Sequence, residues 1–426
     1  MARRRDRELQ YFIDQHVKEA PRALVAEVID RKLKEAGAEM PSAERSRLVE
    51  HILKGDVERF SWDNGTDKTT SLTFSKEDQK GVLDGLETLA AKLPEIFDRS
   101  LKETSAAVLK TLKKEWPAHR ADEEFETANF KTNLEWRWGV GIERLRMMLA
   151  LGLQVGERYH KGLRKGKPSL LRGTLSRLHA RACQVTAEII ALLESGYANG
   201  ALARWRTLHE IGVVAVLLTK SGEHLARCYV DHQSIEAKKA SDEYEASRVH
   251  LGFRPISRRE QERTKRNYQA ALKKYGKPFG GQYGWAVGFV GGGDKPTFRD
   301  LESAAGRASM RSHYKMASYG VHAGPRGAFF SLNQLAGAPA VVAGASNVGL
   351  DEPGQLTALA FSQITYFVWQ EPWTVVDTVN VRLMILLREE AVRAFVQAGR
   401  KLARDERKIQ ERRVHHRAQA RARRGR

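Results

Sequence analysis

Ionisable side chains gather at the start of an otherwise apolar stretch, "GYANGALARWRTLHEIGVVAVLL", which spans residues 196–218. They are Arg204, Arg206, His209 and Glu210. An imidazole exchanges a proton near neutral pH, and a guanidinium group neutralises phosphate or another oxyanion. This stretch therefore combines the residue types needed for acid–base chemistry with those that bind an oxyanion.

The spacing of Arg206 and Glu210 makes them partners. Successive residues of a helix advance by about 100°, so these two side chains lie about 40° apart, one turn from each other. Residues 211–218 are apolar on every side, which indicates a buried helix where an unpaired carboxylate would be costly. Two interpretations stay open: a buried ion pair that fixes helix packing, or the polar floor of a site.

A second polar group lies in "RSHYKMASYGVHAG". On a helix its polar members share about 100° of arc. They are Arg311, Tyr314, Lys315, Ser318 and His322. We expect residues 323–325, Ala-Gly-Pro, to end this helix, which places His322 in the last turn, where the helix dipole favours a protonated imidazole. The stripe can line a cleft or face water, and both alternatives stay open.

Four short motifs in order resemble a bacterial family of all-helical proteins of unknown function. They are "GYANGALARWRTLHE", "ARCYVDH", "YGKPFGGQYGWA" and "FRDL" with "HYKMASYGVHAG", over about residues 170–330. Family members carry an R-x-L-x-E helix, an R-Y-x-D-type helix, a Gly-Trp segment and an S-x-x-V-H helix; here Cys228 interrupts the Arg-Tyr pair. The resemblance implies a helical fold and no established activity. It also implies one shared polar cluster of Arg206, Glu210, Tyr229, Asp231, Ser318 and His322.

The pair Arg204 and His209 also resembles the R-x4–6-H motif of the HEPN superfamily of helical ribonucleases, which often act in toxin and phage-defence systems. That resemblance implies a metal-independent ribonuclease. Arg45/His51 and Arg227/His232 share the spacing, however, so the pattern carries little information in a chain this rich in arginine. Arg204 and His209 also lie about 140° apart on one helix, which makes a common active centre harder to form.

Positive charge is the most distinctive bulk property, with a formal net charge of +20. Residues 400–426 hold twelve Lys or Arg against three acidic residues. Nucleic acid is the natural partner of such a segment, and the alternative is a solvated helix end. The residues expected to contact nucleic acid are Arg400, Lys401, Arg404, Arg412 and Arg413.

Other chemistries find no support. The two cysteines, Cys183 and Cys228, are far apart and form no CxxC motif, which argues against a zinc site and favours a reducing cytoplasm. Phosphate-loop, HExxH and GxSxG motifs are absent, so we expect no cofactor and no metal. No apolar run reaches the roughly 18 residues of a membrane span. The sequence leaves a homodimer open.

The elements that must position these residues are helical. Period-3.6 patterns predict an all-α fold with a helical N-terminal region (1–165), a central multi-helix bundle (166–355) and C-terminal helices that end in a basic tail (356–426). Pro94 and Pro117 are expected to break helices, and Asn64-Gly65 to form a hairpin turn. Two helices should meet near Gly196. We expect Trp136, Trp138 and Trp205 to anchor helix packing rather than stack on bases.

Three functions are therefore open. The first is an enzyme acting on RNA or a nucleotide in defence against phage, with His322 or His209 as the acid–base group and Arg206 stabilising a phosphate. The second is a non-enzymatic nucleic-acid-binding or regulatory module in which the cluster is structural. The third is a scaffold within a larger complex.

Overall fold

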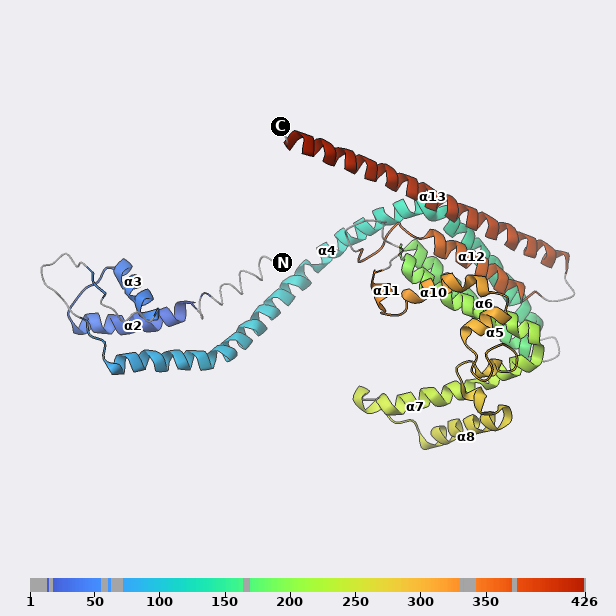
Figure 1. The fold of residues 1–426 in the computed structure, drawn as a ribbon, viewed down its shortest axis with the longest axis horizontal. Helices are drawn as coiled ribbons and strands as arrows, with labels where there is room; N and C mark the ends of the chain where they lie inside the picture. The colour runs from blue at the N-terminus through green and yellow to red at the C-terminus, as the bar shows by residue number, and fades with distance from the viewer. Residues whose placement is uncertain are drawn as a thin grey trace. The chain divides into compact units, whose positions relative to one another are not determined.

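The predicted all-α architecture is confirmed in a computed structural model (Figure 1). The structure describes residues 14, 18–54, 60–62, 72–163, 169–329, 332, 342–369 and 374–424, and for residues 410 and 413–424 it describes the backbone only. No strand occurs within these ranges. The chain divides into two compact units, Met1–Glu126 and Thr127–Arg426. This division does not test the three regions proposed above, which stay predictions.

The described part of the first compact unit contains α2 (Ala20–Glu35), α3 (Ser42–Leu53) and the beginning of α4 (Lys76–Leu163). Val25, Ile29 and Leu33 recur at helical spacing on one face of α2 and pack against Leu48 and Val49 of α3. Asn64-Gly65, the predicted hairpin turn, lies outside the described residues.

The expected helix breaks at Pro94 and Pro117 are wrong, because α4 continues through both prolines. A proline inside a helix removes one backbone hydrogen bond and usually bends the helix. The segments that directly precede the two prolines, "ETLAAKL" before Pro94 and "LKTLKKEW" before Pro117, consist mostly of strong helix formers. Their preference maintains the helix across each proline.

Most of the main core of the second compact unit joins the end of α4 to four other helices (Figure 1). These are α5 (Leu170–Glu194), α6 (Ala198–Asp231), α12 (Asp351–Tyr366) and α13 (Val375–Arg424). The predicted junction of two helices is confirmed at Gly196, whose φ of 76° suits glycine. Trp138 and Trp205 are buried in this core, as predicted. Trp136 is not a packing anchor, because it is 69% exposed.

Helix α13 runs antiparallel to α4 along this core. Ion pairs join Arg137 to Asp405 at 2.8 Å, Arg144 to Glu390 at 2.7 Å and Arg158 to Asp377 at 2.8 Å. Ascending numbers on α4 meet descending numbers on α13. The two helices are therefore held in one register by charged contacts as well as by apolar packing.

A second core covers the later part of α6. Short elements follow the helix pair α7 (Gln233–Leu251) and α8 (Arg258–Tyr275), which lie side by side (Figure 1). They are η2 (Lys277–Gly280), η3 (Gly284–Ala286), α9 (Phe298–Ala304), η4 (Ala308–Met310), α10 (Arg311–Tyr319) and α11 (Pro325–Phe329). Elements η3, α9 and α10 all contact α6.

Helix α6 links the two cores. Its apolar run over residues 211–218 is buried except for the half-buried Val214, as predicted. The sequence pattern predicts a new helix from Gly222, and α6 does consist of two helical segments that meet there at a kink, where φ is 70° and ψ is −155°. The second segment ends at Asp231 and α7 begins at Gln233, so the predicted helix is divided near His232. Residues up to Ile211 pack in the main core and those from Val213 in the second, so Glu210 lies where the cores meet.

Candidate functional site

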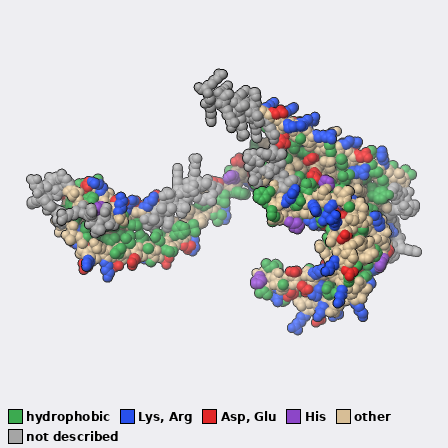
Figure 2. Space-filling view, in the orientation of Figure 1, with side chains coloured by type: hydrophobic (Ala, Val, Ile, Leu, Met, Phe, Trp, Pro, Cys, Tyr) green, Lys and Arg blue, Asp and Glu red, His purple; other side chains and the backbone are tan. Residues whose placement is uncertain are grey.

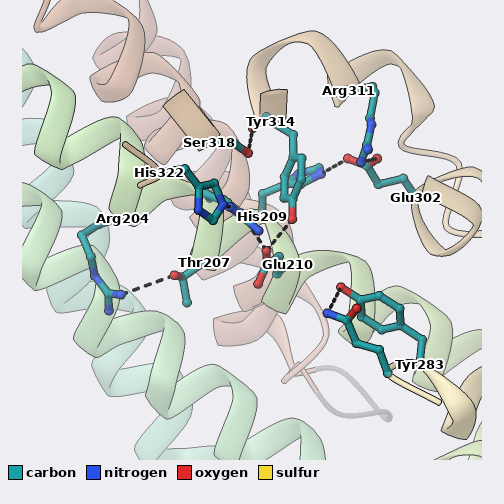
Figure 3. Close-up of polar contacts among 12 residues, drawn as sticks. Arg204, Thr207, His209, Glu210, Tyr283, Glu302, Arg311, Tyr314, Ser318 and His322 are labelled. Atoms are coloured by element: carbon teal, nitrogen blue, oxygen red, sulfur yellow. Dashed lines mark hydrogen bonds and ion pairs between the residues drawn. The ribbon is translucent and has the colours of Figure 1, made fainter. Parts of the chain in front are cut away.

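Arg206, Glu210, Tyr314 and His322 form one contact network. Figure 3 labels Glu210, Tyr314 and His322. Nε of Arg206 donates to Oε1 of Glu210 at 3.0 Å, and the hydroxyl of Tyr314 donates to the same oxygen at 2.7 Å. A terminal nitrogen of Arg206 lies 3.5 Å from Nε2 of His322. The Arg206–Glu210 pair is therefore present as predicted, and it is extended by two residues more than a hundred positions away.

The Arg206–Glu210 pair is half-buried rather than fully buried. The side chains of Arg206 and Glu210 are 24% and 36% exposed. A pair that serves packing alone gains nothing from this exposure. Solvent can therefore reach both side chains, which a polar site floor requires.

Two guanidinium groups lie close to the ring of Tyr314. Arg206 and Arg311 lie 4.7 Å and 5.1 Å from the centre of its ring. Phe298 stacks on the ring at 4.6 Å. Burial and the hydrogen bond to Glu210 raise the pKa of Tyr314 above its usual range. Tyr314 therefore stays protonated at neutral pH, and its hydroxyl donates the hydrogen bond that holds the Glu210 carboxylate in place.

Beneath this network lies a buried ionic layer made of His209, Glu302 and Arg311. Nε2 of His209 lies 3.0 Å from Oε1 of Glu302, and Arg311 donates to Oε2 of Glu302 at 2.8 Å. Glu302 has no exposed surface and His209 is 2% exposed. Burial lowers the pKa of His209, although the Glu302 contact opposes the shift. A neutral His209 thus donates to Glu302 and has no access to a substrate.

A cavity of about 530 Å³ adjoins the network. Its wall includes His322, Tyr319 and Asn199, together with small residues of the turn that follows α10. His322 is exposed on this wall while it contacts Arg206 on its other side. The imidazole is therefore the network residue that a ligand in the cavity would meet first.

The helix that was expected to carry His322 ends earlier than predicted. Helix α10 stops at Tyr319, so His322 is in the following turn and not in the last helical turn. Its backbone N–H still donates to the carbonyl of Ser318 at 3.2 Å. Beyond Tyr319 the side chains of Val321, His322 and Ala323 are exposed, and the segment has no apolar face whose burial would prolong the helix.

Other members of the predicted cluster lie elsewhere. The hydroxyl of Ser318 donates to the backbone carbonyl of Tyr314. Tyr229 packs edge-on against Trp285 at 5.0 Å. Asp231 accepts hydrogen bonds from Lys274 at 2.9 Å and Tyr275 at 2.7 Å, and these contacts tie the end of α6 to α8. Among the described contacts, none joins Tyr229 or Asp231 to Arg206.

The two residues of the R-x4-H pattern face different neighbours. Arg204 forms an ion pair with Glu188 of α5 and donates to Thr207, whereas His209 faces Glu302 of α9 (Figure 3). Their separation around α6 keeps them apart, as the helical geometry predicted.

Glu302 and Tyr283 are site residues that the sequence reasoning missed. Glu302 lies beside Leu301 on α9, so the detectable signal was a carboxylate within an apolar helix turn. Tyr283 lies near Glu210, and burial raises its pKa. It belongs to a glycine-rich segment without periodicity, where no sequence signal pointed to it.

The exposed cations expected on the tail lie on α13. Arg400, Lys401, Arg404 and Arg412 are exposed, and Figure 2 shows Lys and Arg side chains along the described part of this helix. The side chain of Arg413 lies outside the described residues. Nζ of Lys401 lies 3.7 Å from the centre of the Trp136 ring.

Comparison with known proteins gives a match to a family of unknown function, DUF5677, over residues 173–337. This is the part of the chain in which the ordered motifs resemble a helical family of unknown function, and it contains Arg206, Glu210, Tyr314 and His322. Searches of curated proteins and of solved structures found no match. Within the described ranges, no helix is long and apolar enough to cross a membrane.

Proposed function

We propose that the Arg206–His322 site binds a phosphate group of RNA or of a nucleotide and catalyses acid–base chemistry on it without a metal ion. The carrying observation is that an arginine and an exposed histidine lie 3.5 Å apart beside a cavity of about 530 Å³. Arginine binds phosphate oxygens in a fixed fork, and histidine exchanges a proton at physiological pH. Together they supply oxyanion stabilisation and proton transfer.

The long contact between Arg206 and His322 leaves room for a ligand. Arginine only donates hydrogen bonds, so in any hydrogen bond between the two side chains Nε2 of His322 is the acceptor. A distance of 3.5 Å is long for such a bond. A phosphate oxygen can take the Arg206 donor in its place, which frees Nε2 to accept a proton.

The reaction proposed for RNA is transfer within the chain. His322 accepts the proton of the 2′-hydroxyl while the 2′ oxygen forms a bond to phosphorus. The bond from phosphorus to the 5′ oxygen breaks, and the proton passes to that leaving oxygen. The products are a 2′,3′-cyclic phosphate and a 5′-hydroxyl. Arg206 neutralises the charge that develops on the phosphoryl oxygens.

Glu210, Tyr314 and the buried layer act as positioning residues. Glu210 holds Nε of Arg206, and Tyr314 holds Glu210. Arg311 bridges the ring of Tyr314 to the buried Glu302, which also holds His209. In this account His209 orients the site from within and does not contact the substrate.

The test is a comparison of five variants in an RNA cleavage assay that contains a chelator. Arg206→Ala and His322→Ala should each lower the rate by about 100-fold or more while the melting temperature changes little. Arg204→Ala and His313→Ala are matched controls, because each loses an ion pair of similar exposure nearby. Loss of activity in Arg204→Ala and His209→Ala alone would favour the R-x4-H pair instead. Collapse of the melt in Arg206→Ala and His322→Ala would favour a structural cluster.

A second candidate function is nucleic-acid binding by α13, which the exposed Arg400, Lys401, Arg404 and Arg412 support. It is compatible with the enzyme, since the tail can hold the polymer that the site cleaves. Without activity in the cleavage assay, it would describe a binding or regulatory module. Phage defence, a cytoplasmic location and a homodimer stay predictions, which expression during phage infection, fractionation and sedimentation respectively would test.

A further inference from the structure

Trp136 is an exposed aromatic ring among cations. It lies on α4 with 69% of its surface exposed, whereas Trp138, Trp205 and Trp285 are buried. Lys401 lies 3.7 Å and Arg137 5.8 Å from its ring centre. Indole is a costly group to leave in water and a good surface for a flat partner. A ligand that suits this position has a flat apolar surface for the indole and negative charge for the neighbouring cations.

The exposed face of α13 beside Trp136 is a cationic stripe. At about 100° per residue its members share about 120° of arc, opposite the buried Ala391, Phe395 and Ala398. The stripe consists of Arg393, Arg400, Lys401, Arg404, Arg407 and Lys408, all exposed. It extends about 22 Å along the helix, at about 1.5 Å per residue. A chain of phosphates can follow such a row of cations.

One acid next to this stripe is already paired. Asp405 is paired with Arg137 of α4 at 2.8 Å, and that hydrogen bond lowers the pKa of Asp405. The contact places Arg137 beside Trp136 and leaves the α13 cations outward. Glu411 lies at the far end of the stripe and is exposed. The two cations at the Trp136 ring, Lys401 and Arg137, are therefore joined by the outward cations of α13.

We propose that Trp136 and the cationic stripe bind single-stranded nucleic acid, with the backbone along α13 and an unpaired base stacked on the indole. Duplex bases are already stacked and paired, so a stacking platform selects single strands. The arriving base takes the place of the Lys401 ammonium on the ring, and that ammonium then meets a phosphate. This inference deepens the proposed function, on which it rests, by naming the form of the polymer.

The test is binding of a labelled uridine 12-mer and a matched RNA duplex, followed by fluorescence anisotropy. Trp136→Ala should weaken single-strand affinity about tenfold or more and leave duplex affinity within about twofold, because stacking on one aromatic ring has that size. Trp136→Phe should retain most of the affinity. Trp116→Ala is the matched control, an exposed tryptophan of α4 in the other compact unit, and should change nothing.

Three outcomes would overturn the inference. They are an unchanged affinity in Trp136→Ala, wild-type affinity for the duplex equal to that for the single strand, and binding of anionic phosphatidylserine vesicles without binding of RNA. None of them decides the catalytic proposal, because cleavage of a dinucleotide by the Arg206–His322 site does not require α13. If the wild-type protein does not cleave the dinucleotide, the proposed reaction is wrong, and strand binding is still tested by the anisotropy measurement.

Discussion

At the scale of residues, the network is organised around two carboxylates in different surroundings. Glu210 is partly exposed and accepts from Arg206 and Tyr314, whereas Glu302 is fully buried and faces Arg311 and His209. A buried carboxylate persists only when its partners compensate for lost hydration. Glu302 therefore governs whether the upper network keeps its geometry.

Replacing Glu302 by Gln should destabilise the protein by about 3 kcal/mol or more, because it leaves the Arg311 charge without its buried partner. Urea denaturation followed by circular dichroism measures this. Glu352→Gln is the control, since Glu352 is partly exposed and pairs with His313, so a change below about 1 kcal/mol is expected. Equal effects of the two substitutions would contradict the role assigned to Glu302.

His179 should make stability depend on pH. It is 2% exposed, and burial lowers its pKa from 6.5 to about 4. In the unfolded chain His179 is protonated as the pH falls below about 6.5, whereas in the folded chain it is protonated only near pH 4. Stability is therefore complete above pH 6.5 and falls by about 3 kcal/mol as the pH drops to 4.

The measurement is urea denaturation of wild type and His179→Leu across that pH range. His209 shifts in the same direction and contributes to both proteins, so the difference between the two curves isolates His179. Parallel curves would show that His179 does not remain neutral in the folded state.

At the scale of elements, glycines let helices approach closely in the main core. A Cβ on Gly354 of α12 would lie 2.5 Å from the Phe395 ring. Gly354→Ala should therefore cost about 1–3 kcal/mol through overpacking. Gly173→Ala on α5, where nothing lies within 4 Å, should be neutral or stabilising. Thermal melts of both variants check this, and a Gly354→Ala protein as stable as wild type would contradict the packing.

The sequence was most informative where local pattern and burial agree. Periodicity predicts the buried apolar run after Glu210, and it is observed. The glycine at 196 predicts a turn, because glycine tolerates a positive φ, and the turn is observed as well. Pro94 and Pro117 did not end α4, because proline bends a helix that its neighbours favour. The Arg206–Glu210 pair is local and was predictable from spacing.

Contacts between distant elements were not predictable in the same way. Whether His322 meets Arg206 depends on how α10 packs on α6, and Glu302 reaches His209 only through the packing of α9. The resemblance grouped Tyr229 and Asp231 with Arg206, yet they join α8 and Trp285, because α6 changes direction at Gly222 before it reaches them. Trp136 is exposed because its position on α4 lies beside the α13 cations rather than in the core.

At the scale of the whole molecule, the net charge of +20 governs encounters with polyanions. Removal of residues 400–426 should flatten the dependence of nucleic-acid affinity on salt, because fewer counterions are released when fewer cations contact phosphate. Anisotropy at several salt concentrations gives the slope for full-length and truncated protein. An unchanged slope would show that other surfaces supply the phosphate contacts.

The most direct test of the central claim is whether His322 senses a phosphate beside Arg206. Histidine-selective NMR of the protein, titrated with uridine monophosphate, should show the His322 imidazole signal shifting with saturation while the His313 signal stays unchanged. In Arg206→Ala the His322 shift should disappear although the protein remains folded. A His322 chemical shift that does not change with added nucleotide, or that changes equally in Arg206→Ala, would contradict a phosphate site formed by these two residues.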